Sequence, residues 1–269
     1  MKNAKNYSAE HIRYLSGVKK KSVLINVARF AILFAFLFLW ELSAQLNWVN
    51  PFITSSPSRI CKTVAELYTN GTLFYHVGTT LWETLAGFFI AVVLGYSIAL
   101  ILWWSEAVRR ISEPYFVVLN ALPKIALGPL IIIWFGTGST AIVVMTILIG
   151  LIVAILNMLG GFMATDENKL LLLKSMGASK FQILTKLVIP SSLPNFISML
   201  KINVGMAWIG SIMGEYIVSK AGIGYLIVYG GQVFKLDLVM SAVFILCILA
   251  AVMYALVALL EKLVIKNQK

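Results

Sequence analysis

Six apolar runs, each about as long as a membrane-spanning helix, most constrain what this chain can fold into. The hydrocarbon core of a bilayer is about 30 Å thick, and a helix needs roughly 20 apolar residues to cross it. The alternating pattern of a membrane β-barrel is absent. We therefore predict an all-α membrane protein with six transmembrane helices. The runs are Val23–Leu46, Thr79–Trp104, Pro114–Trp134, Thr140–Phe162, Phe196–Val218 and Leu238–Leu260.

Composition excludes a water-soluble globular fold. Hydrophobic residues make up 60% of the chain and charged residues 12%, whereas soluble domains are about half apolar and about a quarter charged. The net charge of +11 could suggest a nucleic-acid partner, but on so apolar a chain these charges must lie mostly outside the bilayer. The two cysteines, Cys61 and Cys247, form no CxxC pair, so neither a disulfide framework nor a thiolate metal site is indicated.

The distribution of basic residues predicts the orientation of the helices. If the N-terminus lies inside, Arg59, Lys62, Lys220 and Lys235 are the only basic residues in the external segments, and the asymmetry follows the positive-inside rule. The first run is long for a cleavable signal and lacks an Ala-x-Ala site, so we expect it to be retained. We predict a cytoplasmic tail at residues 1–22, a transmembrane domain at 23–262 with a cytoplasmic loop at 163–195, and a cytoplasmic tail at 263–269.

The loop between the fourth and fifth runs is too organised for a passive connector. Thr165 is expected to cap a helix whose first turn carries Asp166 and Glu167, where the helix dipole favours negative charge. An apolar patch follows at Leu170–Leu173, and Gly177 permits a break. One interpretation is a hairpin that rests on the lipid headgroups. The other is a docking element for a second protein.

A second amphipathic helix is expected after the break, with Phe181, Leu184 and Leu187 on its apolar stripe. Pro190 and Pro194 are expected to end it, because proline has no backbone N–H to continue a helix. The sequence thus predicts two short helices at the cytoplasmic surface.

This loop resembles the cytoplasmic loop of permease subunits in ATP-binding-cassette (ABC) importers. The family pattern runs Glu-Ala-Ala, three residues, Gly, nine residues, Ile-x-Leu-Pro, and the chain matches its spacing with Gly177, Leu187, Ile189 and Pro190. Leucines replace the Glu-Ala-Ala triplet. The resemblance implies contact with an ATPase through this loop, with candidate residues Asp166, Glu167, Leu171, Leu172, Leu173, Gly177, Ala178, Leu187 and Pro190.

Three further stretches, within a resemblance that covers roughly residues 57–260, are similar to the permeases of the nitrate, sulfonate, taurine and bicarbonate group. They are LPKIALGPLIIIWFG at Leu122–Gly136, AWIGSIMGE at Ala207–Glu215 and AGIGYLI at Ala221–Ile227. The resemblance implies a type I importer permease fold in a bacterial cell membrane. It also implies import of a small solute, with an anion such as a sulfonate, taurine, nitrate or bicarbonate expected first. The alternatives are a thiamine precursor or riboflavin, which relatives of this group carry.

The resemblance also implies the partners: two cytoplasmic ABC ATPases, an extracytoplasmic solute-binding protein and a second permease copy within the lipid bilayer. A homodimer is expected, with a related permease as the alternative second subunit. The chain has no Walker A sequence, so we expect it to bind no cofactor and to leave ATP and Mg²⁺ to its partners. His11 and His76 are far apart in the sequence, and neither a metal site nor a catalytic triad is indicated. We expect a transport subunit, not an enzyme, with no nucleic-acid partner.

Charged residues inside the runs are candidates for the solute pathway, because a charge at membrane depth is costly unless it faces protein or water. They are Glu83, Lys124 and Glu215. Lys124 lies between two prolines, which predicts a broken helix, and it could attract an anion, snorkel to the interface or pair with an acid. Glu215 could line the outer vestibule or accept hydrogen bonds from another helix. Lys201 is interpreted as snorkelling.

Other residues of the fifth run have two interpretations each. Trp208 could seal the pathway or belong to the core. Gly210 and Gly214 form a GxxxG motif that permits close helix packing, either between two permeases or within one. A channel or an ion-coupled secondary transporter is the alternative function, but the chain shows no convincing inverted repeat. A membrane scaffold is a third possibility.

Overall fold

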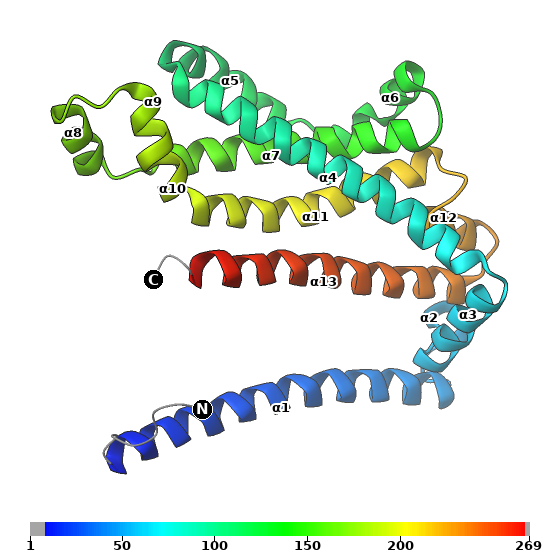
Figure 1. The fold of residues 1–269 in the computed structure, drawn as a ribbon. Helices are drawn as coiled ribbons and strands as arrows, with labels where there is room; N and C mark the ends of the chain where they lie inside the picture. Colours follow the sequence, from blue (N-terminus) through cyan, green and yellow to red (C-terminus); the bar gives the residue numbers. More distant parts are fainter. Residues whose placement is uncertain (1–8, 267–269) are drawn as a thin grey trace. The chain divides into compact units, whose positions relative to one another are not determined.

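The computed structural model describes residues 9–266, and the elements in that range are helices and turns (Figure 1). The chain divides into two units, residues 1–63 and 64–269, which are considered separately. The first contains α1 (Ala9–Gln45), α2 (Pro51–Thr54) and the beginning of α3 (Pro57–Thr69). Glu41 near the end of α1 accepts hydrogen bonds from the backbone N–H and the hydroxyl of Ser58, at 2.9 and 2.8 Å. These bonds tie the start of α3 to the end of α1.

Within residues 9–266, five helices are long and apolar enough to cross a membrane, or six spans result if one bent helix pair counts as a single span. The five helices are α1 over Val23–Gln45, α4 (Thr72–Trp104), α7 (Ser139–Met163), α11 (Leu193–Val218) and α13 (Leu236–Lys266). The predicted third run, 114–134, falls on a bent pair instead: α5 (Glu106–Ala121) meets η1 (Lys124–Leu127) and α6 (Gly128–Phe135) at 86°. The expected break therefore lies at Leu122 and Pro123, because Pro123 cannot donate the next helical hydrogen bond.

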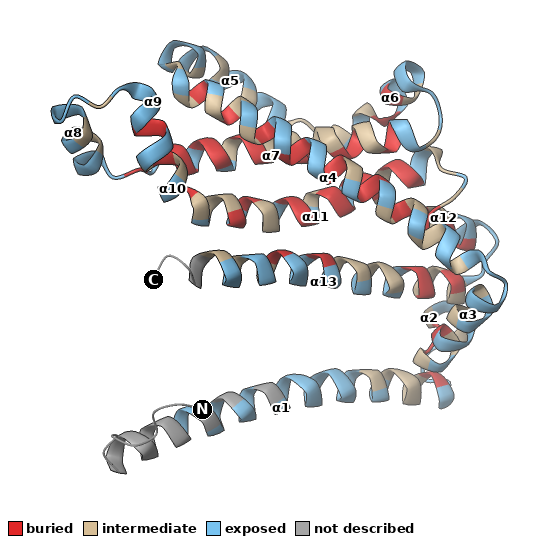
Figure 2. Ribbon diagram, in the orientation of Figure 1, coloured by how far each residue is buried: buried red, intermediate tan, exposed pale blue. Residues whose placement is uncertain are grey.

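α7 forms the centre of the second unit and packs against both α4 and α11. Buried residues follow these three helices in Figure 2. Glycines allow the close approach on both sides: a Cβ on Gly95 of α4 would lie 2.4 Å from the Ala154 Cβ, and one on Gly210 of α11 would lie 2.6 Å from the Thr146 Cα. A Cβ on Gly214 of α11 would likewise lie 3.1 Å from the Ile142 Cα of α7. The GxxxG motif thus packs within the chain.

A smaller apolar cluster joins α12 (Ile223–Gln232) to α13 and to the first turns of α4. Its buried members are Ile223, Leu226, Leu238 and Ala242. Farther along, an ion pair between Lys201 and Glu261 joins α13 to α11. Lys201, interpreted from the sequence as snorkelling to the membrane surface, therefore has an acidic partner within the chain. α12 was not predicted as a separate element, because its ten residues are too few to span a membrane.

The α8–α9 loop, residues 164–192, lies at the end of this unit where α4 and α7 finish and α11 begins (Figure 1). It consists of α8 (Glu167–Ser175), α9 (Lys180–Ile183), a π-helical turn η2 (Leu184–Val188) and α10 (Ile189–Ser191). The turn between α4 and α5 is at the same end. The two short helices that the sequence predicts are therefore present, and a third helical turn leads into α11.

Candidate functional site

The first helix of the α8–α9 loop is capped by a different residue from the one predicted. The Asp166 side chain accepts a hydrogen bond from the backbone N–H of Asn168 at 2.9 Å and caps α8. The prediction that Thr165 caps this helix is wrong: its hydroxyl is buried and donates to the Phe162 carbonyl oxygen at 2.9 Å. With Glu167 in the first turn, two acids still lie at the positive end of the helix dipole.

Gly177 ends α8 in a Schellman motif. Its φ is +76°, its N–H donates to the carbonyl of Lys174, and the N–H of Ala178 donates to the carbonyl of Leu173, both at 3.0 Å. A Cβ on Gly177 would meet no atom within 4 Å. The backbone conformation, and not crowding inside the chain, therefore explains the glycine.

The sequence predicts that Pro190 ends the second helix, and this prediction is wrong. α9 begins with a capping box formed by Ser179 and Gln182, and the chain stays helical through the π turn and Pro190 to the end of α10. The backbone N–H of Ile189 bonds to the carbonyl of Leu184 across the wider π turn. The π turn re-registers the hydrogen bonds where a proline without an N–H must be accommodated.

α8 has an inner and an outer face. Leu170 and Leu173 are half-buried against the main core, as is Ala178 after the glycine. Leu171 and Leu172 are 65% and 60% exposed. Leu187 is half-buried and Pro190 exposed. Among the candidate docking residues, the structure thus leaves Leu171 and Leu172 free for a partner, while Leu173 and Ala178 anchor the loop.

Two buried acids from different helices meet inside the second unit. Glu83 of α4 and Glu215 of α11 are each 1% exposed, and their side chains interact. Beside them the Thr84 hydroxyl donates to the Ser211 hydroxyl at 2.7 Å and links the same two helices. One oxygen of each carboxyl group has no hydrogen-bond partner among the described residues. The packing of α4 on α11 brings these two sequence candidates together.

Side chains from two other helices cap the N-terminus of α12. The backbone N–H groups of residues 222–224 donate, in order, to His76 Nδ1 at 3.1 Å, to Thr80 Oγ1 at 2.7 Å and to the Glu215 carboxylate. The first N–H groups of a helix have no partner within the helix, so these bonds satisfy three of them. Of its two predicted roles, Glu215 has the structural one of hydrogen-bond acceptor here.

The sequence analysis missed His76 and Thr80 as members of this cluster. Both lie on the face of α4 that carries Glu83, because positions 76, 80 and 83 follow the three- and four-residue spacing of a helix. That spacing is the one signal in the sequence that could have grouped them. Their partner, the start of α12, is more than 140 positions away in the chain.

The remaining pathway candidates lie elsewhere. Lys124 is in η1 at the break between α5 and α6, and its Nζ donates to the Asn120 carbonyl oxygen at 3.1 Å. Trp208 is buried in the main core among residues of α4, α7 and α11. Neither side chain belongs to the polar cluster around Glu83 and Glu215. Within the described residues, no group of three or more His, Cys, Asp or Glu side chains is arranged to hold a metal ion.

Most of the chain matches a known protein family. Residues 91–266 match the family of the binding-protein-dependent transport system inner membrane component. The chain belongs to this family. The permease is 31% identical over 231 residues to the formylaminopyrimidine transport permease protein of Halalkalibacterium halodurans, which covers 86% of this chain and 92% of that protein. It is 24% identical over 259 residues to a putative aliphatic sulfonates transport permease protein of Bacillus subtilis, with 96% and 93% covered.

The fold also matches that of a solved importer. The structure is similar to a chain of the bacterial alginate ABC transporter in complex with alginate pentasaccharide-bound periplasmic protein, with a TM-score of 0.60, 13% identity, and coverage of 91% of this chain and 96% of that one. These findings confirm the predicted resemblance and the importer-permease fold. The permease is a multi-pass inner-membrane transport component and not an enzyme.

Proposed function

We propose that the permease imports a small nitrogen heterocycle of the formylaminopyrimidine type. A binding protein delivers this solute from outside, and two ATPases bound at the α8–α9 loop drive its passage. The permease of Halalkalibacterium halodurans, which is 31% identical to this chain, is named for formylaminopyrimidine transport, and the match covers 92% of its length.

A sulfonate is the second candidate, and it keeps the anion that the sequence analysis expected first. The relative named for aliphatic sulfonates matches 96% of this chain, although at 24% identity. Lys124, half-buried at the break in the bent pair, is the residue that would attract such an anion.

Substrate-stimulated ATP hydrolysis separates the two candidates. The permease is reconstituted in liposomes with its ATPase and its binding protein, and hydrolysis is measured with a formylaminopyrimidine or with an aliphatic sulfonate. We expect stimulation by the formylaminopyrimidine alone. Stimulation by the sulfonate alone would establish the second candidate and refute the first.

The outer face of α8 supports the proposed ATPase contact. Leu171 and Leu172 are large apolar side chains that remain exposed on a surface helix, and exposed apolar patches of this kind mark protein interaction sites. Leu172→Glu should abolish co-purification of the ATPase, because a charge replaces an apolar contact. The matched control is Lys169→Gln, also exposed on α8. Equal retention of the ATPase by both variants would refute this contact.

We also propose a homodimer with the α8–α9 loop and both chain termini in the cytoplasm. The basic residues of the sequence support the orientation. The mass of the intact complex should correspond to two copies of this chain and two ATPases. One copy beside a different permease would refute the homodimer. ATP and Mg²⁺ belong to the ATPase subunits in this proposal.

A further inference from the structure

A cavity of about 450 Å³ lies at the α8–α9 end of the permease. Its walls come from the end of α4, the start of α5, the end of α7 and the α8–α9 loop. This volume falls within the range of about 300–1,000 Å³ that small-ligand sites occupy. The polar cluster around Glu83 and Glu215 contributes none of the lining residues, so the cavity is a separate feature of the molecule.

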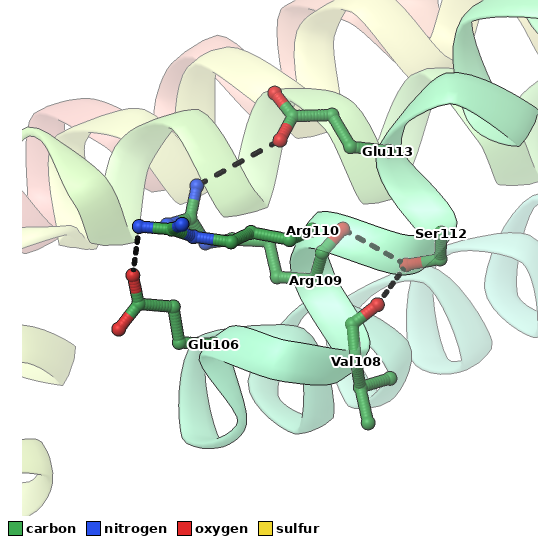
Figure 3. Close-up of polar contacts among 6 residues, drawn as sticks. All are labelled: Glu106, Val108, Arg109, Arg110, Ser112 and Glu113. Atoms are coloured by element: carbon green, nitrogen blue, oxygen red, sulfur yellow. Dashed lines mark hydrogen bonds and ion pairs between the residues drawn. The ribbon is translucent and has the colours of Figure 1, made fainter.

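The charged lining of the cavity has a positive excess. It consists of Arg109, Lys174, Lys180 and Glu106. Glu106 is already paired with Arg110 at 2.6 Å, whereas Arg109 approaches Glu113 only at 3.8 Å (Figure 3). Lys174 forms no ion pair within the described part of the chain. Glu106 is thus neutralised by Arg110 from outside the lining, Arg109 is held only loosely by Glu113, and Lys174 is left to attract an anion.

Two tryptophans place the cavity at the level of a membrane surface. Lys180 Nζ donates to the Trp104 carbonyl oxygen and lies 5.9 and 5.4 Å from the ring centroids of Trp103 and Trp104. These residues end the membrane-spanning helix α4. Tryptophan is enriched where a span meets the headgroups, so we expect Lys180 to lie at headgroup depth.

The rest of the lining is apolar, including Trp103, Leu170 and the buried Ile183. An occupant that satisfies both parts carries an anionic group and an apolar group. We propose that the cavity binds the phosphate of an anionic phospholipid, such as phosphatidylglycerol, with Arg109, Lys174 and Lys180 as its contacts. Basic pockets between helices at the cytoplasmic surface bind lipid headgroups by this chemistry.

The lipid site and the ATPase contact lie on different faces of α8. Leu171 and Leu172 are absent from the cavity lining, and Lys174 and Leu170 are part of it. A bound lipid would therefore brace the inner face of the loop while the outer face remains open to the ATPase. The lipid site depends on the proposed function only for the orientation that places the loop at the cytoplasmic surface.

Native mass spectrometry of the intact permease–ATPase complex tests the site. The complex is titrated with phosphatidylglycerol and with phosphatidylcholine of identical acyl chains, in the absence of transported solute. We expect tighter binding of phosphatidylglycerol, weakened about 5-fold each by Lys174→Gln and Arg109→Gln, since each cation near the surface contributes about that much. Lys169→Gln, on the same helix but outside the lining, should leave the affinity unchanged. Lys174→Arg should restore binding.

Other outcomes would overturn the lipid site. Equal binding of the two lipids, or an unchanged affinity in both lining variants, would show that the cavity does not select an anionic headgroup. Displacement by glycerol phosphate at the same concentration as the lipid would assign the cavity to a soluble phosphate ester. Loss of the ATPase with full retention of phosphatidylglycerol in Lys174→Gln would assign it to the ATPase contact. Failure of solute import would leave lipid retention unaffected, so the two proposals fail separately.

Discussion

Gly222 leaves the space that the Glu215 carboxyl group occupies. A Cβ built on Gly222 would lie 2.4 Å from the carboxyl carbon of Glu215, and the φ of Gly222 is +108°. A side chain at this position would therefore meet both a steric conflict and a strained backbone. This contact joins the stretch 207–215, which ends in the acid, to the stretch 221–227, which begins α12. The two motifs act as one structural unit.

Gly222→Ala should lower the free energy of unfolding by at least about 1 kcal/mol, because an L side chain in the left-handed region costs about that much before the clash is counted. The apparent Tm of the purified permease in detergent reports the change. Gly231→Ala is the matched control, because Gly231 lies on α12, has no positive φ, and leaves open space where the alanine Cβ would lie. Equal effects of the two substitutions would contradict the fit between Gly222 and Glu215.

Glu215→Gln should keep the apparent Tm and transport close to those of the wild type. The amide oxygen can still accept from the Gly224 N–H, and the amide N–H can donate to Glu83. Glu215→Leu leaves the backbone N–H of Gly224 buried without its acceptor and should cost about 1–3 kcal/mol. If Glu215→Gln folds normally but abolishes transport, the charge of Glu215 acts in the pathway and the structural role is insufficient.

Hydropathy predicted the long helices because each must present about twenty apolar residues to the bilayer. Prolines on both sides of Lys124 likewise predicted a break in the third run, since the missing N–H is a local property. The angle of 86° was not predictable, because packing of α6 on α7 sets it. Hydropathy could not predict α12 either, because a helix of ten residues can be half-buried without spanning the membrane.

The polar cluster shows where prediction from the sequence stopped. Glu83 and Glu215 were each recognisable as costly intramembrane charges, but their contact depends on how α4 and α11 pack across more than 120 residues of chain. In the loop, Gly177 was predictable from its spacing. The choice of Asp166 over Thr165 as cap was not, because the structure assigns the Thr165 hydroxyl to a different carbonyl.

The ion pair between Lys201 and Glu261 should stabilise the packing of α11 on α13. Lys201→Gln and Glu261→Gln should each lower the apparent Tm, and the double variant should lose less than the sum of the two, as expected for residues that interact directly. Lys262→Gln, one position along α13 and exposed, is the control and should have little effect. Additive losses would show that the two residues act independently.

The proposed orientation predicts which side of the membrane labels the loop. With Cys61 and Cys247 replaced by serine, a single cysteine at Lys169 should react with a membrane-impermeant maleimide only after the cells are opened. A cysteine at Lys220, between α11 and α12, should react in sealed cells. Labelling of the cysteine at position 169 in sealed cells would show that the topology is reversed. The loop could then not contact a cytoplasmic ATPase.

The proposed coupling role of the α8–α9 loop is tested most directly at Gly177. The φ of +76° penalises a β-branched residue by about 1–2 kcal/mol, whereas asparagine tolerates this conformation. Co-purification of the ATPase and solute-stimulated ATP hydrolysis are measured for Gly177→Val and for its control, Gly177→Asn. We predict that Gly177→Val inserts normally but loses the ATPase and the stimulated hydrolysis, and that Gly177→Asn retains both. Normal docking together with normal transport in Gly177→Val would contradict the assignment of this loop to coupling.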